Sequence, residues 1–155
     1  MNVLITGASA GFGKALAERL VANGHRVVGC ARRIDKLNAL ADTLGENFLP
    51  VVMDVSDTDS IPQIIADLPD DFKQIDVLVN NAGLALGTEP AHKASLDDWM
   101  RMTDTNVKGL MALTHAVLPA MVERDSGYII NVGSIAGNWP YFGGNVYGAT
   151  KAFVK

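Results

Sequence analysis

Short apolar runs alternate with amphipathic stretches along the whole chain. The apolar runs are typical of buried parallel strands and fall at residues 2–6, 26–31, 48–53, 76–79 and 128–132. The stretches between them carry apolar residues at helical spacing and predict helices over residues 11–23, 34–44, 57–68 and 95 to about 123. Strands that alternate with helices form parallel sheets with right-handed crossovers. The pattern therefore predicts a single α/β domain built on a doubly wound parallel sheet.

Two local signals mark the longest predicted helix. Ser95, followed by Asp97 and Asp98, resembles a capping box in which Asp replaces the usual Glu or Gln. Pro119 falls inside the apolar pattern of the same helix, where a proline removes a backbone hydrogen bond. We therefore expect this helix to start after Ser95 and to kink or end early at Pro119.

Composition and charge narrow the class of protein. The 155 residues are 48% hydrophobic and 19% charged, which suits one globular domain with buried strands. The formal net charge of −4 gives no indication of binding to nucleic acids or anionic membranes. Cys30, the one cysteine, lies in an apolar run and is expected to be a reduced core residue. We recognise no signal peptide and no membrane-spanning run, so the predicted compartment is the cytoplasm.

A glycine-rich turn follows the first predicted strand and opens directly into the first predicted helix. Its sequence is Thr6-Gly7-Ala8-Ser9-Ala10-Gly11-Phe12-Gly13. Glycines let a backbone approach a pyrophosphate closely, and a helix N-terminus offers free N–H groups and a favourable dipole. The position of the turn between strand and helix indicates a dinucleotide site, and the alternative is a glycine turn that binds nothing.

The end of the second predicted strand bears on the choice of nucleotide. NAD sites usually place a carboxylate there to hold the ribose 2′-hydroxyl, whereas here Ala31 is followed by Arg32 and Arg33. Two guanidinium groups can bind a 2′-phosphate through charge-assisted hydrogen bonds. The sequence therefore favours NADP over NAD, although Ala10 adds no positive charge to the turn. The alternative is that both arginines are solvated residues at the start of the next helix.

Three residues near the end of the chain form a pattern suited to proton transfer. Ser134 precedes Tyr147 by thirteen residues, and Lys151 follows four residues later. In a helix, Tyr147 and Lys151 share one face, and a lysine cation beside a phenol favours its ionised form. Such a tyrosine can act as general acid and base, while Ser134 can donate a hydrogen bond to a substrate oxygen. Because this spacing also occurs by chance on surface helices, it needs support from the rest of the chain.

Taken in order, these segments resemble the short-chain dehydrogenase/reductase family. The glycine turn is followed by Asn80-Asn81-Ala82-Gly83, by Asn106 in the long helix, and by Ser134 with Tyr147 and Lys151. The resemblance implies a Rossmann-like sheet of which five strands are present and the last two are missing, since the match covers only the first part of a typical member. We therefore expect residues 1–155 to be a C-terminally truncated NADP-binding domain, and to be weakly active or inactive by itself.

The resemblance also implies a role for each matched residue. Tyr147 would be the catalytic acid and base, Lys151 would assist it and bind the nicotinamide ribose, and Ser134 would polarise the substrate carbonyl. Asn106 would interrupt the long helix, so that its backbone carbonyl holds a water in a proton relay. The residues implied in cofactor binding are Gly7, Ser9, Gly11, Phe12, Gly13, Arg32, Arg33, Asp54, Val55, Asn81, Tyr147 and Lys151.

Simpler interpretations stay open for some of these residues. Asp54, with Ser56 just after it, could cap the next helix. Asn80 and Asn81 could serve only to satisfy backbone groups at a strand end. Asn106 could be an ordinary polar residue of a helix.

A narrower resemblance, to the NADP-dependent 3-hydroxy acid dehydrogenases, rests on residues 84–94 and 133–147. It implies a small hydroxy acid or semialdehyde as substrate, with Trp139, Pro140 and Tyr141 as pocket walls or simply as loop packing. The implied partners include no metal, nucleic acid or membrane, and the complete protein would be a homo-oligomer. The alternative is an inactive or non-catalytic nucleotide-binding fragment of such a reductase, and the glycine spacing disfavours a sugar-nucleotide epimerase.

Overall fold

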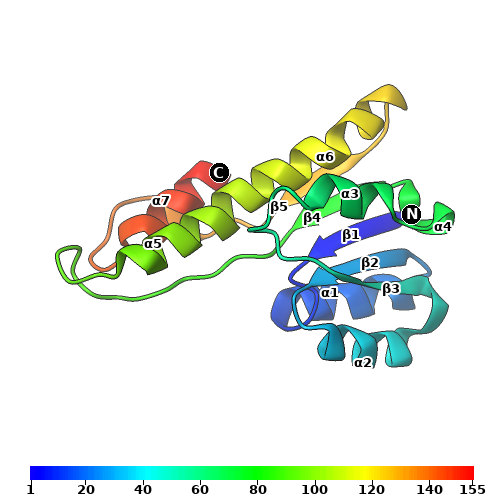
Figure 1. Ribbon diagram of the computed structural model, residues 1–155, viewed down its shortest axis with the longest axis horizontal. Coiled ribbons are helices and arrows are strands. Elements are labelled where there is room, and N and C mark those ends of the chain that lie inside the picture. The colour runs from blue at the N-terminus through cyan, green and yellow to red at the C-terminus, as the bar shows by residue number, and fades with distance from the viewer.

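The computed structural model describes all 155 residues and contains a five-stranded sheet in which every pairing is parallel (Figure 1). Its strands are β1 (Asn2–Thr6), β2 (Arg26–Ala31), β3 (Phe48–Val52), β4 (Val77–Asn80) and β5 (Tyr128–Asn131). Their spatial order is β3-β2-β1-β4-β5, so the direction in which strands are added reverses at β1. In such sheets a crevice forms outside the carboxyl ends of the strands at this point of reversal. The predicted doubly wound sheet is confirmed.

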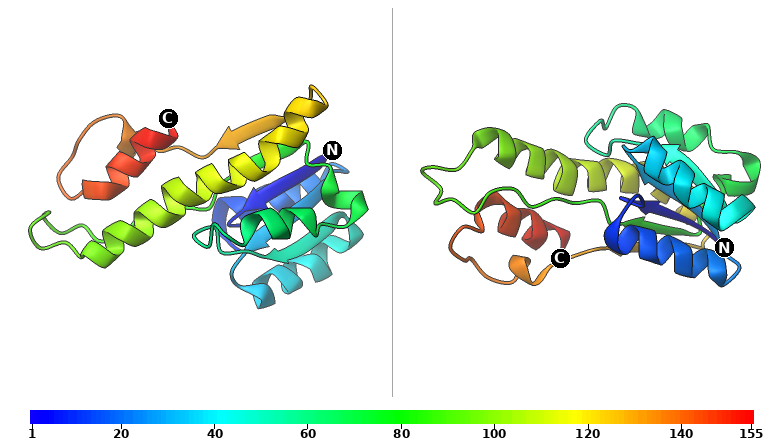
Figure 2. Two further views of the ribbon diagram at one scale, coloured as in Figure 1. Left: turned by 45° about the horizontal axis from the view of Figure 1, so that its top comes forward. Right: turned by 90° about the horizontal axis from the view of Figure 1, so that it is seen from below.

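Helices cover both faces of the sheet (Figure 2). The elements are α1 (Gly11–Ala22), α2 (Ile34–Leu44), η1 (Gly45–Asn47), α3 (Ile61–Ala66), α4 (Asp70–Lys73), α5 (Leu96–Thr103), η2 (Asp104–Gly109), α6 (Leu110–Glu123), η3 (Ile135–Gly137) and α7 (Asn145–Val154). Val3 and Ile5 of β1 belong to the core shared with α1 and α2. Leu4, between them, belongs to the core shared with α3, α4 and α6. Because both faces are buried, the strands read as continuous apolar runs rather than alternating ones.

The long helix predicted from residue 95 is present, but its middle turn is irregular. Ser95 caps it, since the Ser95 Oγ accepts a hydrogen bond from the Asp98 amide at 3.3 Å. Between α5 and α6 the backbone forms the π-helix η2. The expected early end at Pro119 is wrong, because α6 continues to Glu123. Val117 and Met121, on either side of the proline, are buried in the core, and this packing offsets the missing backbone hydrogen bond.

The segment after β3 also differs from the prediction. Helix α3 spans only Ile61–Ala66, because the preceding residues form a turn in which the Asp57 amide donates to the Asp54 carbonyl at 3.0 Å. Asp54 therefore does not cap this helix, and its Oδ1 accepts hydrogen bonds from Ser56 instead. The four-residue helix α4 was not predicted.

Helices α5 and α7 project together beyond the sheet as an arm, visible in both views of Figure 2. Helix α7 packs against α5, η2 and η3. Strand β5 has β4 as its one neighbour, and Tyr128 and Ile130 of β5 are exposed. In no helix is an apolar stretch long enough to cross a membrane.

Candidate active site

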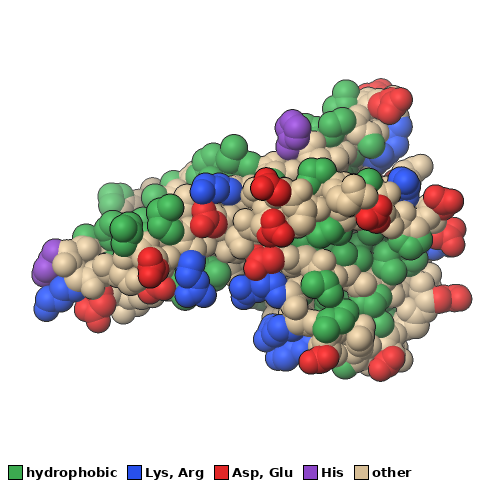
Figure 3. Space-filling view, viewed as in Figure 1, with side chains coloured by type: hydrophobic (Ala, Val, Ile, Leu, Met, Phe, Trp, Pro, Cys, Tyr) green, Lys and Arg blue, Asp and Glu red, His purple; other side chains and the backbone are tan.

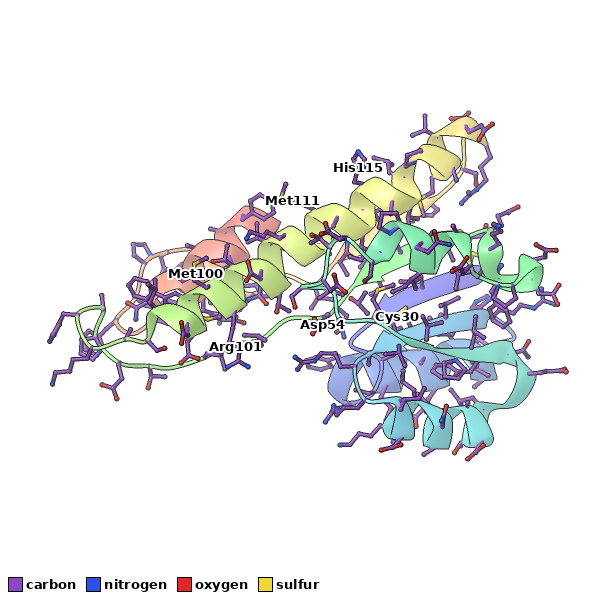
Figure 4. The ribbon with its side chains drawn as sticks, viewed as in Figure 1. Cys30, Asp54, Met100, Arg101, Met111 and His115 are labelled. Carbon is purple, nitrogen blue, oxygen red and sulfur yellow. The ribbon has the colours of Figure 1, made fainter.

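A cleft of about 410 Å³ opens beyond the carboxyl ends of the central strands. Figure 3 shows the surface hollowed where the arm leaves the sheet, with Lys and Arg side chains gathered along this edge, and Figure 4 places Asp54 at the same junction. Nine residues predicted to bind a cofactor line the cleft, namely Gly7, Ser9, Gly11, Phe12, Arg32, Arg33, Asp54, Val55 and Asn81. The other lining residues, which the prediction did not name individually, are Ala10, Ala31, Met53, Ala82, Gly83, Leu84 and Thr105. Most of these are direct neighbours of predicted residues, and that adjacency was the available signal.

The glycine turn is shaped by close backbone contacts. Gly7 and Gly11 have φ angles of 69° and 56°, in the left-handed region that favours glycine. Gly13 does not line the cleft, and it serves the turn differently. A Cβ on Gly13 would lie 2.5 Å from the Gly7 carbonyl oxygen, which is closer than real contacts allow. Gly13 therefore lets α1 begin directly against the turn. The N-terminus of α1 faces the cleft, because Gly11 and Phe12 line it.

Asn81 joins the carboxyl ends of β1 and β4. Its Nδ2 donates to the Thr6 carbonyl at 2.8 Å, and its backbone amide donates to the Thr6 Oγ1 at 3.0 Å. Asn80 is buried, and its Nδ2 donates to the Thr114 Oγ1 at 3.1 Å and to the Asn131 Oδ1 at 2.9 Å. The simpler interpretation, that these side chains satisfy backbone groups at a strand end, therefore describes Asn81 and not Asn80, whose partners are side chains. Asn81 lies in the cleft wall as well.

The two arginines at the end of β2 have different partners. Arg33 donates from Nη2 to the Ser9 Oγ at 3.0 Å, which brings the arginine and the glycine turn together. Arg32 forms an ion pair of 3.8 Å with Asp54, and its side chain is 66% exposed. Burial alone would raise the pKa of Asp54, but two hydrogen bonds from Ser56 and the Arg32 cation outweigh it and lower the pKa. Cationic and anionic groups are thus both available at this end of the cleft.

The residues predicted to transfer a proton do not line the cleft. Tyr147 and Lys151 are one turn apart on α7, and Ser134 follows β5 at the start of η3. The Ser134 Oγ accepts a hydrogen bond from the Ala136 amide at 3.1 Å. Lys151 is 8% exposed, burial lowers its pKa, and its Nζ donates to the Val132 carbonyl at 2.8 Å.

Gly83 connects the cleft to this group. A Cβ on Gly83 would lie 3.5 Å from the Lys151 Nζ and 3.4 Å from the Asn106 Oδ1. Since Gly83 lines the cleft, the ammonium group of Lys151 reaches the inner end of the cleft wall.

Asn106 is the central residue of the irregular turn η2, and it is 2% exposed. Its Oδ1 accepts from the Leu84 amide at 2.9 Å, and its Nδ2 donates to the Leu84 carbonyl at 2.9 Å. The same Nδ2 donates to the Thr150 Oγ1 at 3.1 Å. The long helix is therefore interrupted where the family resemblance implied, and Asn106 is not an ordinary polar residue of a helix.

The aromatic residues expected to wall the substrate pocket line a separate cavity. This cavity of about 500 Å³ includes Trp139 and Tyr141 but neither Ser134 nor Tyr147. Gly137 explains the course of the loop, because a Cβ there would lie 2.5 Å from the Lys151 carbonyl oxygen. The loop therefore packs directly on the backbone of α7 and passes along another face of the helix.

Comparisons with known proteins agree with this geometry. The family described as short chain dehydrogenase matches residues 1–155. The NADP-dependent 3-hydroxy acid dehydrogenase YdfG of Salmonella typhimurium is 61% identical over 155 residues, which cover all of this chain and 62% of that protein. The serine 3-dehydrogenase of Rhizobium radiobacter is 51% identical over 154 residues, which cover 99% of this chain and 61% of that protein.

Solved structures of dehydrogenases have the same fold as this chain. The closed form of serine dehydrogenase complexed with NADP+ has a TM-score of 0.98 and 57% identity, over 99% of this chain and 62% of that chain. A serine dehydrogenase structure from Escherichia coli has a TM-score of 0.97 and 57% identity, over 99% of this chain and 71% of that chain. The chain thus spans 62% of the length of the curated relative with 61% identity.

Proposed function

The chain belongs to the short chain dehydrogenase family, and from this premise we propose that it carries the nucleotide site and proton-transfer site of an NADP-dependent oxidoreductase. The reaction interconverts a hydroxyl group and a carbonyl on a small 3-hydroxy acid. The observation that carries the proposal is the meeting of Lys151 with the wall of the cleft at Gly83. The names of the relatives, a 3-hydroxy acid dehydrogenase and a serine dehydrogenase, support the substrate class.

The residues of the cleft fit a dinucleotide with a 2′-phosphate. The glycine turn and the N-terminus of α1 suit the pyrophosphate, because they present backbone N–H groups without side chains in the way. Arg33 and Ser9, already hydrogen-bonded to each other, suit the 2′-phosphate, and Arg32 adds a second cation. Asp54 and Val55 suit the adenine. When bound, NADP supplies the hydride acceptor or donor of the reaction.

The chain's own residues handle the proton and the substrate oxygen. In the oxidation, Tyr147 takes the proton of the substrate hydroxyl as hydride leaves the carbon that bears this hydroxyl. In the reduction, Tyr147 returns a proton to the carbonyl oxygen. Ser134 donates a hydrogen bond to the substrate oxygen. An ammonium group has three donors, and the Val132 carbonyl occupies one of those on Lys151. The other two remain for the Tyr147 phenol and the nicotinamide ribose.

Turnover of the chain tests this proposal directly. We expect slow NADP+ reduction, measured by absorbance at 340 nm, with serine or 3-hydroxypropionate as substrate, because the chain spans only 62% of the length of the curated relative. Tyr147→Phe should abolish turnover while leaving NADPH binding unchanged. Tyr128→Phe is the matched control, because Tyr128 is 74% exposed on β5 and distant from the cleft. Turnover that survives Tyr147→Phe would refute the assignment.

A second candidate function is nucleotide binding without catalysis. Two hydrogen bonds favour it, since Ser134 and Lys151 both engage backbone groups rather than Tyr147. A fluorescence titration that shows NADPH binding, together with no turnover of any 3-hydroxy acid, would support this candidate over the first. The first proposal includes a cytoplasmic location and a homo-oligomeric state for the enzyme.

A further inference from the structure

Helix α7 carries Tyr147 and Lys151, yet it lies on the arm and not on the sheet (Figures 1 and 2). Its packing partners are the helical elements α5, η2 and η3. The position of its two functional side chains relative to the cleft therefore depends on a few contacts with those elements and on the hydrogen bond from the Lys151 Nζ to the Val132 carbonyl.

Thr150, between Tyr147 and Lys151 in sequence, makes the most buried of these contacts. Its side chain is 3% exposed. The Thr150 Oγ1 donates to the Tyr147 carbonyl at 2.8 Å and accepts from the Asn106 Nδ2 at 3.1 Å. One hydroxyl group thus joins the backbone of α7 to the irregular turn of the long helix.

The network continues from Asn106 into the wall of the cleft. The other hydrogen bonds of the Asn106 amide go to the amide and carbonyl of Leu84, a residue that lines the cleft. The Thr150 hydroxyl accepts the remaining N–H of Asn106, so every polar group of the Asn106 side chain has a partner. A valine at position 150 would leave one Asn106 N–H buried without an acceptor, which favours displacement of the helix.

We propose that Thr150 is a positioning residue, which holds α7 against Asn106 and thereby sets where Tyr147 and Lys151 lie relative to the cleft. The effect of Thr150 on catalysis rests on the proposed function, but the placement of α7 can be measured without turnover. Loss of the hydroxyl should loosen α7 and leave the glycine turn and the sheet as they are.

Two substitutions and one control separate the hydroxyl from the shape of the side chain. Thr150→Val keeps the shape and removes the hydroxyl, whereas Thr150→Ser keeps the hydroxyl. Thr43→Val is the matched control, because the Thr43 Oγ1 donates to the Ala39 carbonyl at 3.1 Å within helix α2, on an exposed residue. All variants are made in the 155-residue chain.

The first readouts are hydrogen exchange of the α7 amides and acetylation of Lys151 in competition with the other lysines. We expect both to be about tenfold faster in Thr150→Val, as for the loss of one buried hydrogen bond with an unpaired donor. Thr150→Ser and Thr43→Val should stay within about threefold of the unsubstituted chain, since each keeps the Thr150 network. Exchange in β1 to β4 should not change.

The second readout separates positioning from general stability. With Thr150→Val, kcat should fall about tenfold or more while the Kd for NADPH stays within about threefold, because the glycine turn and the arginines still hold the nucleotide and only the ribose contact of Lys151 is displaced. Unchanged exchange and acetylation in Thr150→Val would overturn the inference, and so would a Thr150→Ser variant as loose as the valine variant. If the unsubstituted chain shows neither NADPH binding nor turnover, the proposed function is refuted. Hydrogen exchange and acetylation would still decide whether Thr150 positions α7.

Discussion

Replacing Arg33 with alanine should remove most of the preference of the chain for NADPH over NADH. The Arg33 guanidinium is held at the glycine turn by its 3.0 Å hydrogen bond to Ser9, where the two groups together would bind a 2′-phosphate. Arg32 is instead paired at 3.8 Å with Asp54, and its side chain is 66% exposed. The two neighbouring arginines should therefore contribute unequally to the free energy of NADPH binding.

The expected magnitudes follow from the kind of contact each arginine makes. A hydrogen bond to a charged group contributes about 1.5–3 kcal/mol, so Arg33→Ala should weaken NADPH binding by roughly 10- to 150-fold. An exposed ion pair contributes about 0–1 kcal/mol, so Arg32→Ala should weaken NADPH binding by about fivefold or less. Neither change should affect NADH, which has no 2′-phosphate.

Fluorescence titrations with NADPH and NADH at one fixed salt concentration measure both effects. Arg19→Ala is the matched control, because Arg19 is an exposed cation in the last turn of α1, at the end of the helix opposite the cleft. Equal weakening of NADPH binding by Arg32→Ala and Arg33→Ala would refute the division of roles. Equal weakening of NADPH and NADH by Arg33→Ala would refute the assignment of Arg33 to the 2′-phosphate.

Three further predictions address the turn, the core and the response to acid. Gly13→Ala should abolish NADPH binding and destabilise the fold by about 1–3 kcal/mol, since the added Cβ would lie 2.5 Å from the Gly7 carbonyl oxygen. An unchanged affinity of this variant for NADPH would contradict the close packing. Burial raises the pKa of Cys30 to about 12, so this thiol should resist alkylation at pH 8 until denaturant is added, and rapid reaction of the folded chain would count against it. Burial opposes ionisation of Asp76, but the hydrogen bond from the Asn2 amide and its other partners lower its pKa below 3.8. Asp76→Asn should therefore lower Tm at pH 7 by an amount that disappears as the pH falls below about 4, and a difference independent of pH would refute this.

The sheet was largely predictable because its strands are buried on both faces. The bounds of β1 and β2 agree with the predicted runs, since an apolar run ends where the chain leaves the core. Of the two alternatives expected at Pro119, the early helix end was wrong, because the buried packing of Val117 and Met121 keeps α6 helical past the proline. The start of α3 was also missed, because Asp54 and Ser56 bond each other rather than a helix end.

The candidate site was predictable as a set of residues but not as a set of contacts. The glycine turn and the arginines were recognisable because phosphate chemistry needs backbone access and positive charge at that point of the fold. The pairing of Arg33 with Ser9 joins residues 24 positions apart, and that of Thr150 with Asn106 joins residues 44 positions apart. No local pattern contains such pairs, because chain folding alone brings them together.

The sequence by itself thus determined the α/β architecture, the glycine turn between β1 and α1, and the residue types proposed for proton transfer. Each of these depends on residues close together in the chain, through periodicity, glycine geometry or side-chain chemistry. Only the tertiary structure decided that the Lys151 ammonium lies against Val132, that Trp139 faces another side of α7, and that Thr150 ties this helix to Asn106. These are consequences of how α7 packs on the long helix, and the free energy of that packing belongs to the folded chain rather than to any one segment.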